Sequence, residues 1–455
     1  MRKSLLLLYL RFICRLNTCA RIIHFACRRY NERNFLIDPE TNTTLTYNAF
    51  SVRVAKKVFD LKHQGLHPGE VYVYSAPNSL EFFETRAACH KMGVVFFGIP
   101  AHLSLDVKEY FIDQVRGRKF PGVSTLNLSS GTTGKVPKVV IVSDENWVSS
   151  LYGYIRNATI PLGPKETFLC TVSFLAAGSA TFLPAFASGM AYVVVKEDIS
   201  YERIVAHIKT YHVTRLYLTP SRLIEFMEWC KKHKEKPAGL RNIITGTERL
   251  PTRVLREAIQ YFGPIITVGY GMVEALPPLA MLSSKDLDRV TSAGLICKGV
   301  RIKITPEGGI AIKGKTVSYG YLNNPEETKK RFFEDWFYSN DYGWIDRDRY
   351  LYVLGRKEDI ILDKPQRVFA GEIEEELVNA FDFIKHSAVL RTEAGIVVCV
   401  SLRGNATKPE ADMKIRDFLS RTSLKVSIIP DKVMIMDELP INALGKLDRQ
   451  KLSSS

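Results

Sequence analysis

A segment rich in glycine and hydroxyl residues lies in the first third of the chain and has the composition of an anion-binding loop. Residues 128–138 read Leu-Ser-Ser-Gly-Thr-Thr-Gly-Lys-Val-Pro-Lys. Glycines allow backbone N–H groups to approach an anion closely, while hydroxyl and ammonium groups add donors and positive charge. The segment therefore predicts a phosphate-binding loop, although a solvated turn before the strand expected at 139–143 would have a similar composition.

Two acidic residues follow apolar runs, at positions where open α/β sheets present ligand-binding groups. Glu274 closes the segment Gly-Tyr-Gly-Met-Val-Glu after a strand expected at 265–268, where a carboxylate could hold a metal ion. Asp341 follows an aromatic run, and an aspartate can accept hydrogen bonds from two ribose hydroxyls. Lys446 lies in a glycine-containing turn near the C-terminus. Each residue alone is a weak indication, because most charged residues are simply solvated.

A match to the Walker pattern is misleading in this chain. Residues 309–316 read Gly-Ile-Ala-Ile-Lys-Gly-Lys-Thr and fit G-x-x-x-x-G-K-T. A functional Walker loop joins a strand to a helix. Here the central residues have strand character and the residues that follow do not start a helix, so we expect a strand rather than a phosphate site.

The elements that must position these residues alternate between apolar strands and helices over most of the chain. Strands expected at 71–75, 139–143, 191–195, 214–218 and 242–245 are separated by helices at 80–92, 147–156, 201–210, 221–233 and 252–262. This alternation predicts an α/β fold with parallel sheets covered by helices. After about Gly299 the strands alternate apolar and polar residues, as antiparallel strands do, and after Arg356 a small α+β unit follows.

The predicted architecture is therefore a large N-terminal domain of parallel-sheet α/β subdomains with a small β-rich subdomain, joined by a hinge to a small α+β C-terminal domain. We place the domains at 1–30, 31–355 and 356–455, the first being a basic N-terminal leader or amphipathic helix. The hinge is expected in the charged segment 355–359. A surface helix and a helix lying on an anionic membrane both fit residues 1–30.

Composition excludes several classes of protein. The 455 residues carry a net charge of +15, with 46% hydrophobic and 24% charged residues, as in ordinary globular proteins and unlike disordered or collagen-like chains. The basic balance favours anionic partners. The 8 cysteines form no C-x-x-C pair, which predicts free thiols in the cytoplasm and argues against a zinc site. The chain contains no run of 18 apolar residues, so the sequence predicts no membrane-spanning helix.

Taken in order, these segments resemble the motifs of the adenylate-forming superfamily, which contains acyl-CoA synthetases, AMP-dependent ligases and adenylation domains. The resemblance runs from about Leu36 to Leu452. One such motif is weakly specific, whereas the complete set in this order is highly specific. The matching segments are 45–47, 65–69, 129–138, 246–248, 270–274, 339–341, 355–356 and 440–449.

The resemblance implies an enzyme that uses ATP and Mg²⁺ to activate a carboxylic acid as an acyl-adenylate. It then implies transfer to a thiol, either of CoA or of the phosphopantetheine of an acyl carrier protein, with no nucleic-acid partner. Residues 31–355 would be the adenylation domain and 356–455 a lid. Lys446, Glu274 and Arg356 would be catalytic, Glu274 would hold Mg²⁺, and Glu358 would be the hinge acid. The implied nucleotide contacts are Ser129, Ser130, Gly131, Thr132, Thr133, Gly134, Lys138, Gly246, Thr247, Glu248, Tyr270, Gly271, Asp341, Arg356 and Arg367.

The segment that aligns with the acyl pocket indicates the type of acid. The resemblance assigns Phe174, Leu175, Ala176 and Gly178 to this pocket, with Leu175 where amino-acid-activating relatives carry an aspartate. A substrate ammonium buried against leucine would lack its partner at a cost of several kcal/mol. We therefore expect an apolar acid, fatty or aryl.

Several departures from the superfamily pattern support a rival interpretation. Val273 and Asn340 replace a threonine and a glycine of two motifs, Pro365 replaces a common glycine, and the chain is short between 112 and 124. The rival is a degenerate member that binds nucleotide or acyl-adenylate without turnover and acts as an interaction protein. The retained charged residues favour the enzyme, because such groups stabilise the charge that develops during adenylation.

Overall fold

The computed structural model describes residues 12, 15–129, 137–158, 162–363, 367–393, 395–404, 406–421, 424, 427–440 and 447–453. Several sequence-based assignments lie outside these residues: the leader before Phe12, the loop residues Ser130, Gly131, Thr132, Thr133 and Gly134, and the positions Pro365 and Lys446. Within the described residues, no helix is both long and apolar enough to cross a membrane.

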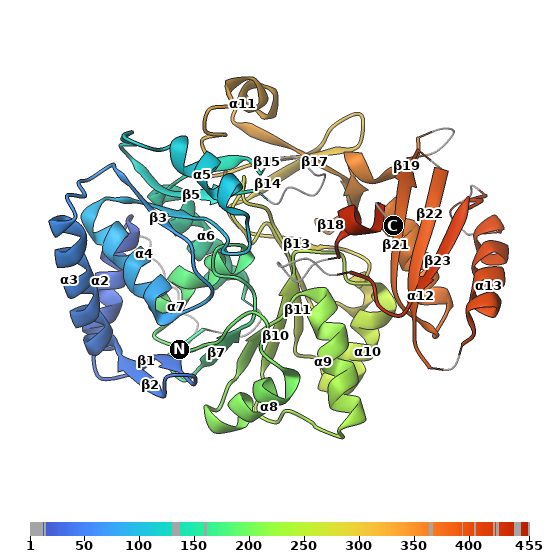
Figure 1. Ribbon diagram of the computed structural model, residues 1–455, viewed down its shortest axis with the longest axis horizontal. Helices are drawn as coiled ribbons and strands as arrows, with labels where there is room; N and C mark the ends of the chain where they lie inside the picture. Colours follow the sequence, from blue (N-terminus) through green and yellow to red (C-terminus); the bar gives the residue numbers. More distant parts are fainter. Residues whose placement is uncertain are drawn as a thin grey trace.

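A 14-stranded sheet runs through the middle of the molecule and changes character along its width (Figure 1). One part is parallel, in the order β11-β10-β9-β7-β8-β1, with β2 antiparallel at the edge. Buried apolar runs form these strands, as parallel strands with covered faces require. Their bounds are β1 Asn34–Asp38, β2 Thr43–Thr46, β7 Thr167–Cys170, β8 Ala191–Val194, β9 Arg215–Tyr217, β10 Asn242–Gly246 and β11 Ile266–Tyr270.

The other part of this sheet is antiparallel and forms the β-rich region of the large domain. Its order continues from β11 as β12-β13-β18-β17-β15-β14, with β16 paired to β17. The false Walker segment forms strand β15, as its sequence predicted. The bounds are β12 Ala280–Ser283, β13 Gly294–Ile296, β14 Arg301–Ile304, β15 Gly309–Lys313, β16 Phe332–Phe333, β17 Trp336–Ile345 and β18 Tyr350–Arg356, with η2 at Leu287–Arg289.

A second sheet of four strands, β3-β4-β5-β6, forms the other α/β subdomain. Its strands are β3 Val71–Tyr74, β4 Val95–Gly98, β5 Val123–Leu128 and β6 Val139–Ser143, of which β5 and β6 are antiparallel. Most of the accompanying helices begin at side-chain caps; Ser143, for example, forms a capping box with Asn146 at the start of α6. They are α2 Cys19–Arg29, α3 Tyr47–His63, α4 Leu80–Met92, α5 Leu105–Asp113, α6 Asp144–Asn157 and, after η1 Ala177–Thr181, α7 Phe182–Ser188.

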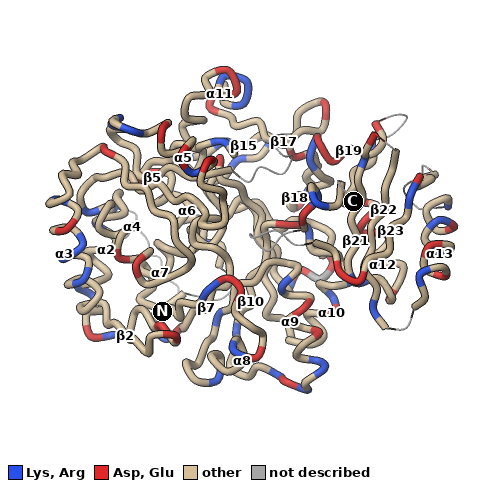
Figure 2. Tube along the Cα trace, in the orientation of Figure 1, with Lys and Arg blue, Asp and Glu red and all other residues tan. Residues whose placement is uncertain are grey.

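The apolar face of α2 is used inside the protein. Cys19, Ile22, Ile23, Ala26 and Cys27 are buried, and the helix contacts α7, α3 and α4. Arg28 and Arg29 remain exposed at the end of the helix. Figure 2 shows basic residues on many elements of the chain, intermixed with acidic ones rather than confined to α2.

Three further helices of the large domain pack beside the parallel strands: α8 Tyr201–Thr210, α9 Pro220–Lys232 and α10 Thr252–Phe262. Helix α11 Pro325–Arg331 instead contacts β16 and β17 of the antiparallel part. Helix α10 buries Val254, Leu255 and Ala258 and keeps its polar side outward, which is the pattern of a surface helix on a sheet.

The C-terminal part begins after β18 with the short helix η3 Lys357–Asp359, inside the segment that we expected to be the hinge. A two-stranded sheet, β19-β20, and a three-stranded sheet, β21-β22-β23, follow. The elements are β19 Ile360–Leu362, β20 Val368–Phe369, α12 Ala370–Ala380, β21 Ile384–Thr392, β22 Gly395–Leu402, α13 Lys408–Ser420, β23 Lys432–Met436 and α14 Arg449–Ser453.

Charged side chains join the C-terminal part to the large domain. Arg249 forms an ion pair with Glu375 of α12, and Thr252 donates a hydrogen bond to the same carboxylate. Arg253 pairs with Asp382 through a contact of 2.7 Å. Helix α12 therefore lies against the start of α10, at the right of Figure 1.

Candidate functional site

One half of the candidate site lies on three strands of the large sheet. Tyr270 is the last residue of β11, while Asp341 in β17 and Arg356 at the end of β18 face each other in the strand register. The Tyr270 hydroxyl donates a 2.6 Å hydrogen bond to Asp341 Oδ2, and Arg356 Nε lies 3.4 Å from Asp341 Oδ1. Backbone pairing therefore fixes a buried carboxylate between a phenol and a guanidinium. We call these residues the nucleotide half.

The charges of the nucleotide half depend on one another. Burial raises the pKa of Asp341, and the opposite charge of Arg356 and the Tyr270 hydrogen bond work against that rise. Burial would lower the pKa of Arg356, but Asp341 and Glu358 together raise it. Burial also raises the pKa of Tyr270, so this residue stays a neutral donor. Asp341 therefore presents an acceptor surface with Arg356 as its counter-ion.

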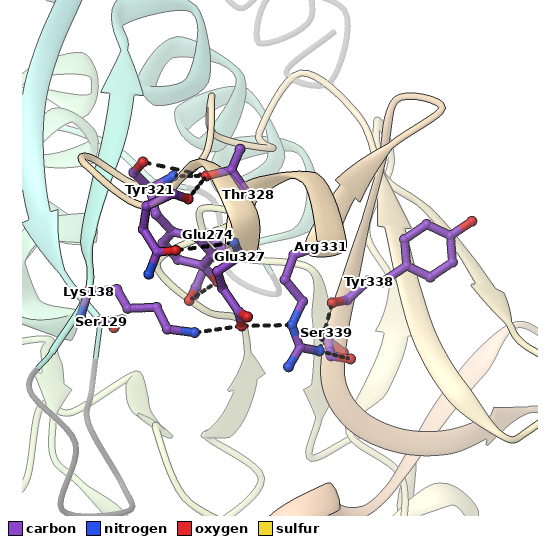
Figure 3. A network of polar contacts seen from close by, with 10 residues as sticks. Ser129, Lys138, Glu274, Tyr321, Glu327, Thr328, Arg331, Tyr338 and Ser339 are labelled. Carbon is purple, nitrogen blue, oxygen red and sulfur yellow. Dashed lines mark hydrogen bonds and ion pairs between the residues drawn. The ribbon is translucent and has the colours of Figure 1, made fainter.

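The other half of the site brings together residues from distant parts of the chain (Figure 3). Lys138, at the downstream end of the predicted phosphate loop, forms a 2.7 Å ion pair with Glu327 of α11. Arg331, one turn further along α11, pairs with the same Glu327 oxygen at 3.1 Å. The Lys138 ammonium also lies 4.8 Å from the centre of the Tyr321 ring. These residues form what we call the phosphate half.

The ends of the predicted phosphate loop are held together by two hydrogen bonds. The Ser129 N–H donates to the Lys138 carbonyl at 2.9 Å, and the Lys138 N–H donates to Ser129 Oγ at 3.0 Å. The two residues end the antiparallel pair β5–β6, whose register fixes their distance. The loop residues 130–136 themselves lie outside the described part of the chain.

Glu274 lies where the two halves meet. Its Oε1 accepts a 3.0 Å hydrogen bond from the Tyr321 hydroxyl. Burial raises the pKa of Glu274, while the positive charges of Arg356 and Lys138 lower it, so both halves act on this carboxylate. A carboxylate oxygen is a ligand that Mg²⁺ prefers, and Mg²⁺ commonly combines one or two carboxylates with substrate phosphates. The residues present therefore fit the ion that the sequence predicted here.

A glycine is required beside Tyr270. A Cβ on Gly271 would lie only 2.4 Å from the Cβ of Pro277, so no other residue fits without movement. The chain can turn closely past Pro277 only with glycine at this position. This packing explains the Tyr-Gly pair that the sequence displayed.

Residues 246–248, which were expected to line the nucleotide, begin at Gly246, the last residue of strand β10. Thr247 has a positive φ of 79°, a conformation that threonine rarely adopts. Glu248 Oε1 accepts a 2.9 Å hydrogen bond from the N–H of Leu447. Leu447 follows Lys446, so a carboxylate of the large domain contacts the backbone immediately after the expected catalytic lysine.

The expected acyl-pocket residues separate into two groups. The Phe174 ring is 1% exposed and packs against Phe82, Phe83 and Tyr192, so its side chain belongs to the aromatic core and does not line a pocket. Leu175 and Ala176 are only partly buried. Gly178 is buried against the Val172 and Ser173 carbonyls, each 2.6 Å from where a Cβ would lie.

Arg367 and Glu358 lie on the C-terminal side of the site. Arg367 pairs with Asp363 at 3.0 Å and donates a 2.9 Å hydrogen bond to the Glu307 carbonyl. Its guanidinium lies 4.6 Å from the centre of the Tyr342 ring. Glu358 lies in η3 and raises the pKa of Arg356. These contacts join Arg367 to the β14–β15 turn rather than to Tyr270 or Asp341.

Sequence reasoning missed three residues of the phosphate half: Tyr321, Glu327 and Arg331. A pattern for two of them was present, because Asn324-Pro325 is a typical helix start and Glu327 and Arg331 have the i,i+4 spacing of a helical ion pair. Nothing in the sequence placed that helix beside Lys138, which is 189 positions away from Glu327.

Comparison with known proteins agrees with this geometry. Residues 122–322 match the family described as AMP-binding enzyme. A 2-succinylbenzoate–CoA ligase of Listeria monocytogenes serotype 4b (strain F2365) is 27% identical over 330 residues, covering 71% of this chain and 68% of the relative. A medium/long-chain-fatty-acid–CoA ligase (FadD8) of Mycobacterium tuberculosis (strain ATCC 25618 / H37Rv) is 27% identical over 364 residues, covering 74% of this chain and 61% of the relative.

The fold also matches solved structures. The O-succinylbenzoate coenzyme A synthetase of Bacillus subtilis, in complex with ATP and magnesium ion, aligns with a TM-score of 0.80 at 21% identity, covering 95% of this chain and 98% of that one. This likeness confirms the fold class predicted from the sequence, an α/β protein with a C-terminal α+β part. The AMP-binding match covers residues 122–322 and agrees with the resemblance to the adenylate-forming superfamily.

Proposed function

We propose that this protein activates a carboxylic acid with ATP, forming an acyl-adenylate and pyrophosphate, and then transfers the acyl group to the thiol of CoA. The observation that carries the proposal is geometric: Tyr270 and Arg356 hold the buried Asp341 carboxylate, and Glu274 accepts a hydrogen bond from Tyr321, whose ring centre lies 4.8 Å from the Lys138 ammonium. The curated relatives, which are CoA ligases, support the same reaction and disfavour a member without turnover. They also favour CoA over a carrier protein as acceptor.

Each residue of the site would have a separate role in binding ATP and Mg²⁺. Asp341 would accept hydrogen bonds from the ribose hydroxyls, while Tyr270 and residues 246–248 would border the base. Lys138 and the loop that begins at Ser129 would neutralise the phosphates. Glu274 would hold Mg²⁺, which neutralises phosphate charge when it is bound. Lys446, the catalytic lysine that the resemblance implies, would neutralise negative charge on the attacking carboxylate and the α-phosphate.

Both reactants of the first step are anions, so the reaction needs positive charge placed in advance. The carboxylate oxygen attacks the α-phosphorus, and the bond between that phosphorus and the bridging oxygen of pyrophosphate breaks. The thiol then attacks the acyl carbon and AMP leaves. Arg356, whose pKa is raised by its acidic neighbours Asp341 and Glu358, stays charged throughout.

The decisive experiment is ATP–pyrophosphate exchange with a panel of carboxylic acids, on wild type and Lys446→Ala. We expect Lys446→Ala to lower exchange by about 10²–10³-fold without changing Tm, because it removes a charge that stabilises the transition state. Lys451→Ala is the matched control, since Lys451 is an exposed lysine on the following helix α14. Exchange that is equal in wild type and Lys446→Ala would refute the assignment. ATP binding without exchange for any acid would support the rival, a non-catalytic binding protein.

The acid that we propose is apolar, fatty or aryl. Leu175 supports this choice, since it stands where amino-acid-activating relatives carry a carboxylate, and its Cδ2 lies 2.7 Å from where a Cβ on Gly98 would be. Leu175→Asp would place a carboxylate in this packed apolar position, which is costly. We expect the variant to lose roughly tenfold or more in kcat/KM for apolar acids. Better use of amino acids than of apolar acids by wild type would contradict the proposal.

A further inference from the structure

A cluster of metal-ligating side chains lies away from the candidate active site, among α2, α4, β5 and α6. Cys19, His90 and Asp144 each offer a ligand atom, and these atoms lie within 4.8 Å of one another. Ser124 Oγ lies between two of them, donating to Asp144 Oδ1 at 2.7 Å and lying 3.2 Å from His90 Nδ1. His90 Nδ1 and Asp144 Oδ1 are 3.8 Å apart.

The cluster is enclosed by the protein. Cys19 is 0% exposed, the His90 side chain 2% and the Asp144 side chain 34%, so only the carboxylate has a path to solvent. The Nε2 atom of His90 is buried with no hydrogen-bond partner among the described residues. Buried polar atoms normally have partners, so this group of side chains is not fully satisfied by its own contacts.

Local structure holds each side chain in place. Cys19 is the first residue of α2, which Thr18 caps. Asp144 is the first residue of α6, which begins with the Ser143–Asn146 capping box. His90 lies in the last turn of α4. The ligand atoms therefore come from the ends of three helices, and each backbone position is fixed before any ion binds.

We propose that Cys19, His90 and Asp144 bind a Zn²⁺ ion, with the Ser124 hydroxyl or a water as the fourth ligand. A thiolate, an imidazole and a carboxylate are ligands that Zn²⁺ accepts, whereas Mg²⁺ and Ca²⁺ require oxygen ligands. Thiolate and carboxylate together balance the charge of the ion. Binding converts the Cys19 S–H bond into an S–Zn bond and releases one proton to solvent.

The buried Arg86 guanidinium lies near the cluster but forms no ion pair with the Asp144 carboxylate. The Arg86 guanidinium lies 4.4 Å from the Trp147 ring centre and 4.3 Å from the Phe182 ring centre, and donates a 3.3 Å hydrogen bond to the Ser179 carbonyl. The negative faces of two aromatic rings stabilise such a cation. No carboxylate of the described residues forms an ion pair with Arg86, and the Asp144 carboxylate, which accepts the Ser124 hydrogen bond, would be the anionic oxygen ligand of the metal ion.

The site would fasten the N-terminal helix to the rest of the large domain. Cys19 belongs to α2, whereas His90 and Asp144 belong to α4 and α6, so one ion would cross-link three elements. The sequence did not predict a zinc site, because the cysteines lack the spacing of a zinc-binding motif. The three ligands are instead brought together by the fold alone, from positions 19, 90 and 144.

The test measures metal binding rather than ligase activity. Protein purified without tag or chelator is analysed for zinc, and EDTA-treated protein is titrated with Co²⁺ alone, whose thiolate complex absorbs in the near ultraviolet. We expect about one zinc per chain, a Co²⁺–thiolate band, and a rise in Tm on adding Zn²⁺. Cys19→Ser should abolish the band, and Asp144→Asn should weaken zinc binding by about 100-fold.

Cys230→Ser is the matched control, because Cys230 is also a buried free cysteine but lies in a different core cluster. Asp144→Asn guards against misfolding, since its side chain is the most exposed of the three ligands. Wild type that binds neither Zn²⁺ nor Co²⁺ would overturn the proposal. So would a thiolate band that survives Cys19→Ser or disappears in Cys230→Ser.

Discussion

The two halves of the candidate site are built in different ways. In the nucleotide half, Asp341 and Arg356 are register partners on neighbouring strands, and Tyr270 ends a third strand of the same sheet. In the phosphate half, Lys138 immediately precedes strand β6 of the other sheet, and its partner Glu327 lies on a short surface helix 189 positions away. Backbone hydrogen bonds fix the first group, whereas side-chain ion pairs assemble the second.

This difference has a consequence for how ATP would bind. The nucleotide half is already paired in a way that leaves Asp341 as an acceptor, so ribose can be received without breaking an ion pair. In the phosphate half, Glu327 holds Lys138 at 2.7 Å, so an incoming phosphate competes with a carboxylate for the same ammonium. The nucleotide half should therefore contribute most of the affinity for ATP. In the phosphate half, competition between Glu327 and phosphate for Lys138 should reduce that affinity.

The largest effect is expected in the nucleotide half. Asp341→Asn keeps an acceptor for the Tyr270 hydroxyl but leaves Arg356 without its carboxylate. Breaking one partner of a largely buried ion pair is costly, so we expect ATP binding to weaken by about 10²-fold. Isothermal titration with ATP and pyrophosphate exchange would both show the loss.

Asp335→Asn is the control for this variant, because Asp335 pairs with Lys313 at 2.9 Å but its side chain is 84% exposed. Exposed ion pairs contribute little, so ATP binding should be unchanged in the control. Equal effects of the two substitutions would show that Asp341 has no special part in binding, and the comparison between the halves would then fail.

The nucleotide half could be predicted from sequence because its residues follow local patterns. Tyr270 ends strand β11 and Glu274 follows it by four residues, while Asp341 lies in an aromatic strand whose alternation is visible in the chain. Several element bounds were also correct, such as the helix at 80–92 and the strand at 139–143. In these places local sequence determines both the element and the position of its functional residue.

The phosphate half could not be completed from sequence, because its ion pairs depend on tertiary packing. Glu327 and Arg331 carry a helical spacing, but only the fold brings their helix to Lys138. Phe174 illustrates a related ambiguity: the apolar segment around it predicts burial, but burial beside a pocket and burial in a core have the same sequence pattern. The Cys19–His90–Asp144 cluster was hidden in the same way.

An intermediate effect is expected where the halves meet, at Glu274. Burial raises the pKa of its carboxyl, and only the ionised form can hold Mg²⁺. As pH falls through this raised pKa, kcat/KM for ATP should fall up to tenfold per pH unit, starting at a higher pH than for an ordinary glutamate. The pH profile of adenylation measures this fall in kcat/KM directly.

Stability should respond to Glu274 in the opposite direction. A carboxyl whose pKa is raised by folding binds more protons in the folded state, so its contribution to the free energy of unfolding grows as pH falls. Glu274→Gln removes the cost of a buried charge and should raise Tm at neutral pH by roughly 1–2 °C while adenylation is lost. A variant that lost both Tm and activity would assign Glu274 a structural part only.

The smallest and most specific effect is expected at Glu327. Its carboxylate accepts from Lys138 and Arg331 through one oxygen, and although burial alone would raise its pKa, these two hydrogen bonds leave the pKa below its usual value. Glu327→Gln keeps the shape of the side chain but removes the charge that competes with phosphate. Lys138 should then be available to ATP, and KM for ATP should fall by a few-fold, the scale of a partly exposed ion pair.

Glu326→Gln provides the matched control, since Glu326 is the neighbouring exposed glutamate on the same turn of α11. It removes the same charge without touching Lys138, so KM for ATP should stay unchanged. The opposite result, a higher KM in Glu327→Gln, would mean that Glu327 positions Lys138 for the phosphate instead of competing with it. In that case the phosphate half would be as preorganised as the nucleotide half. The contrast between residues fixed by backbone hydrogen bonds and residues assembled by side-chain ion pairs would then disappear.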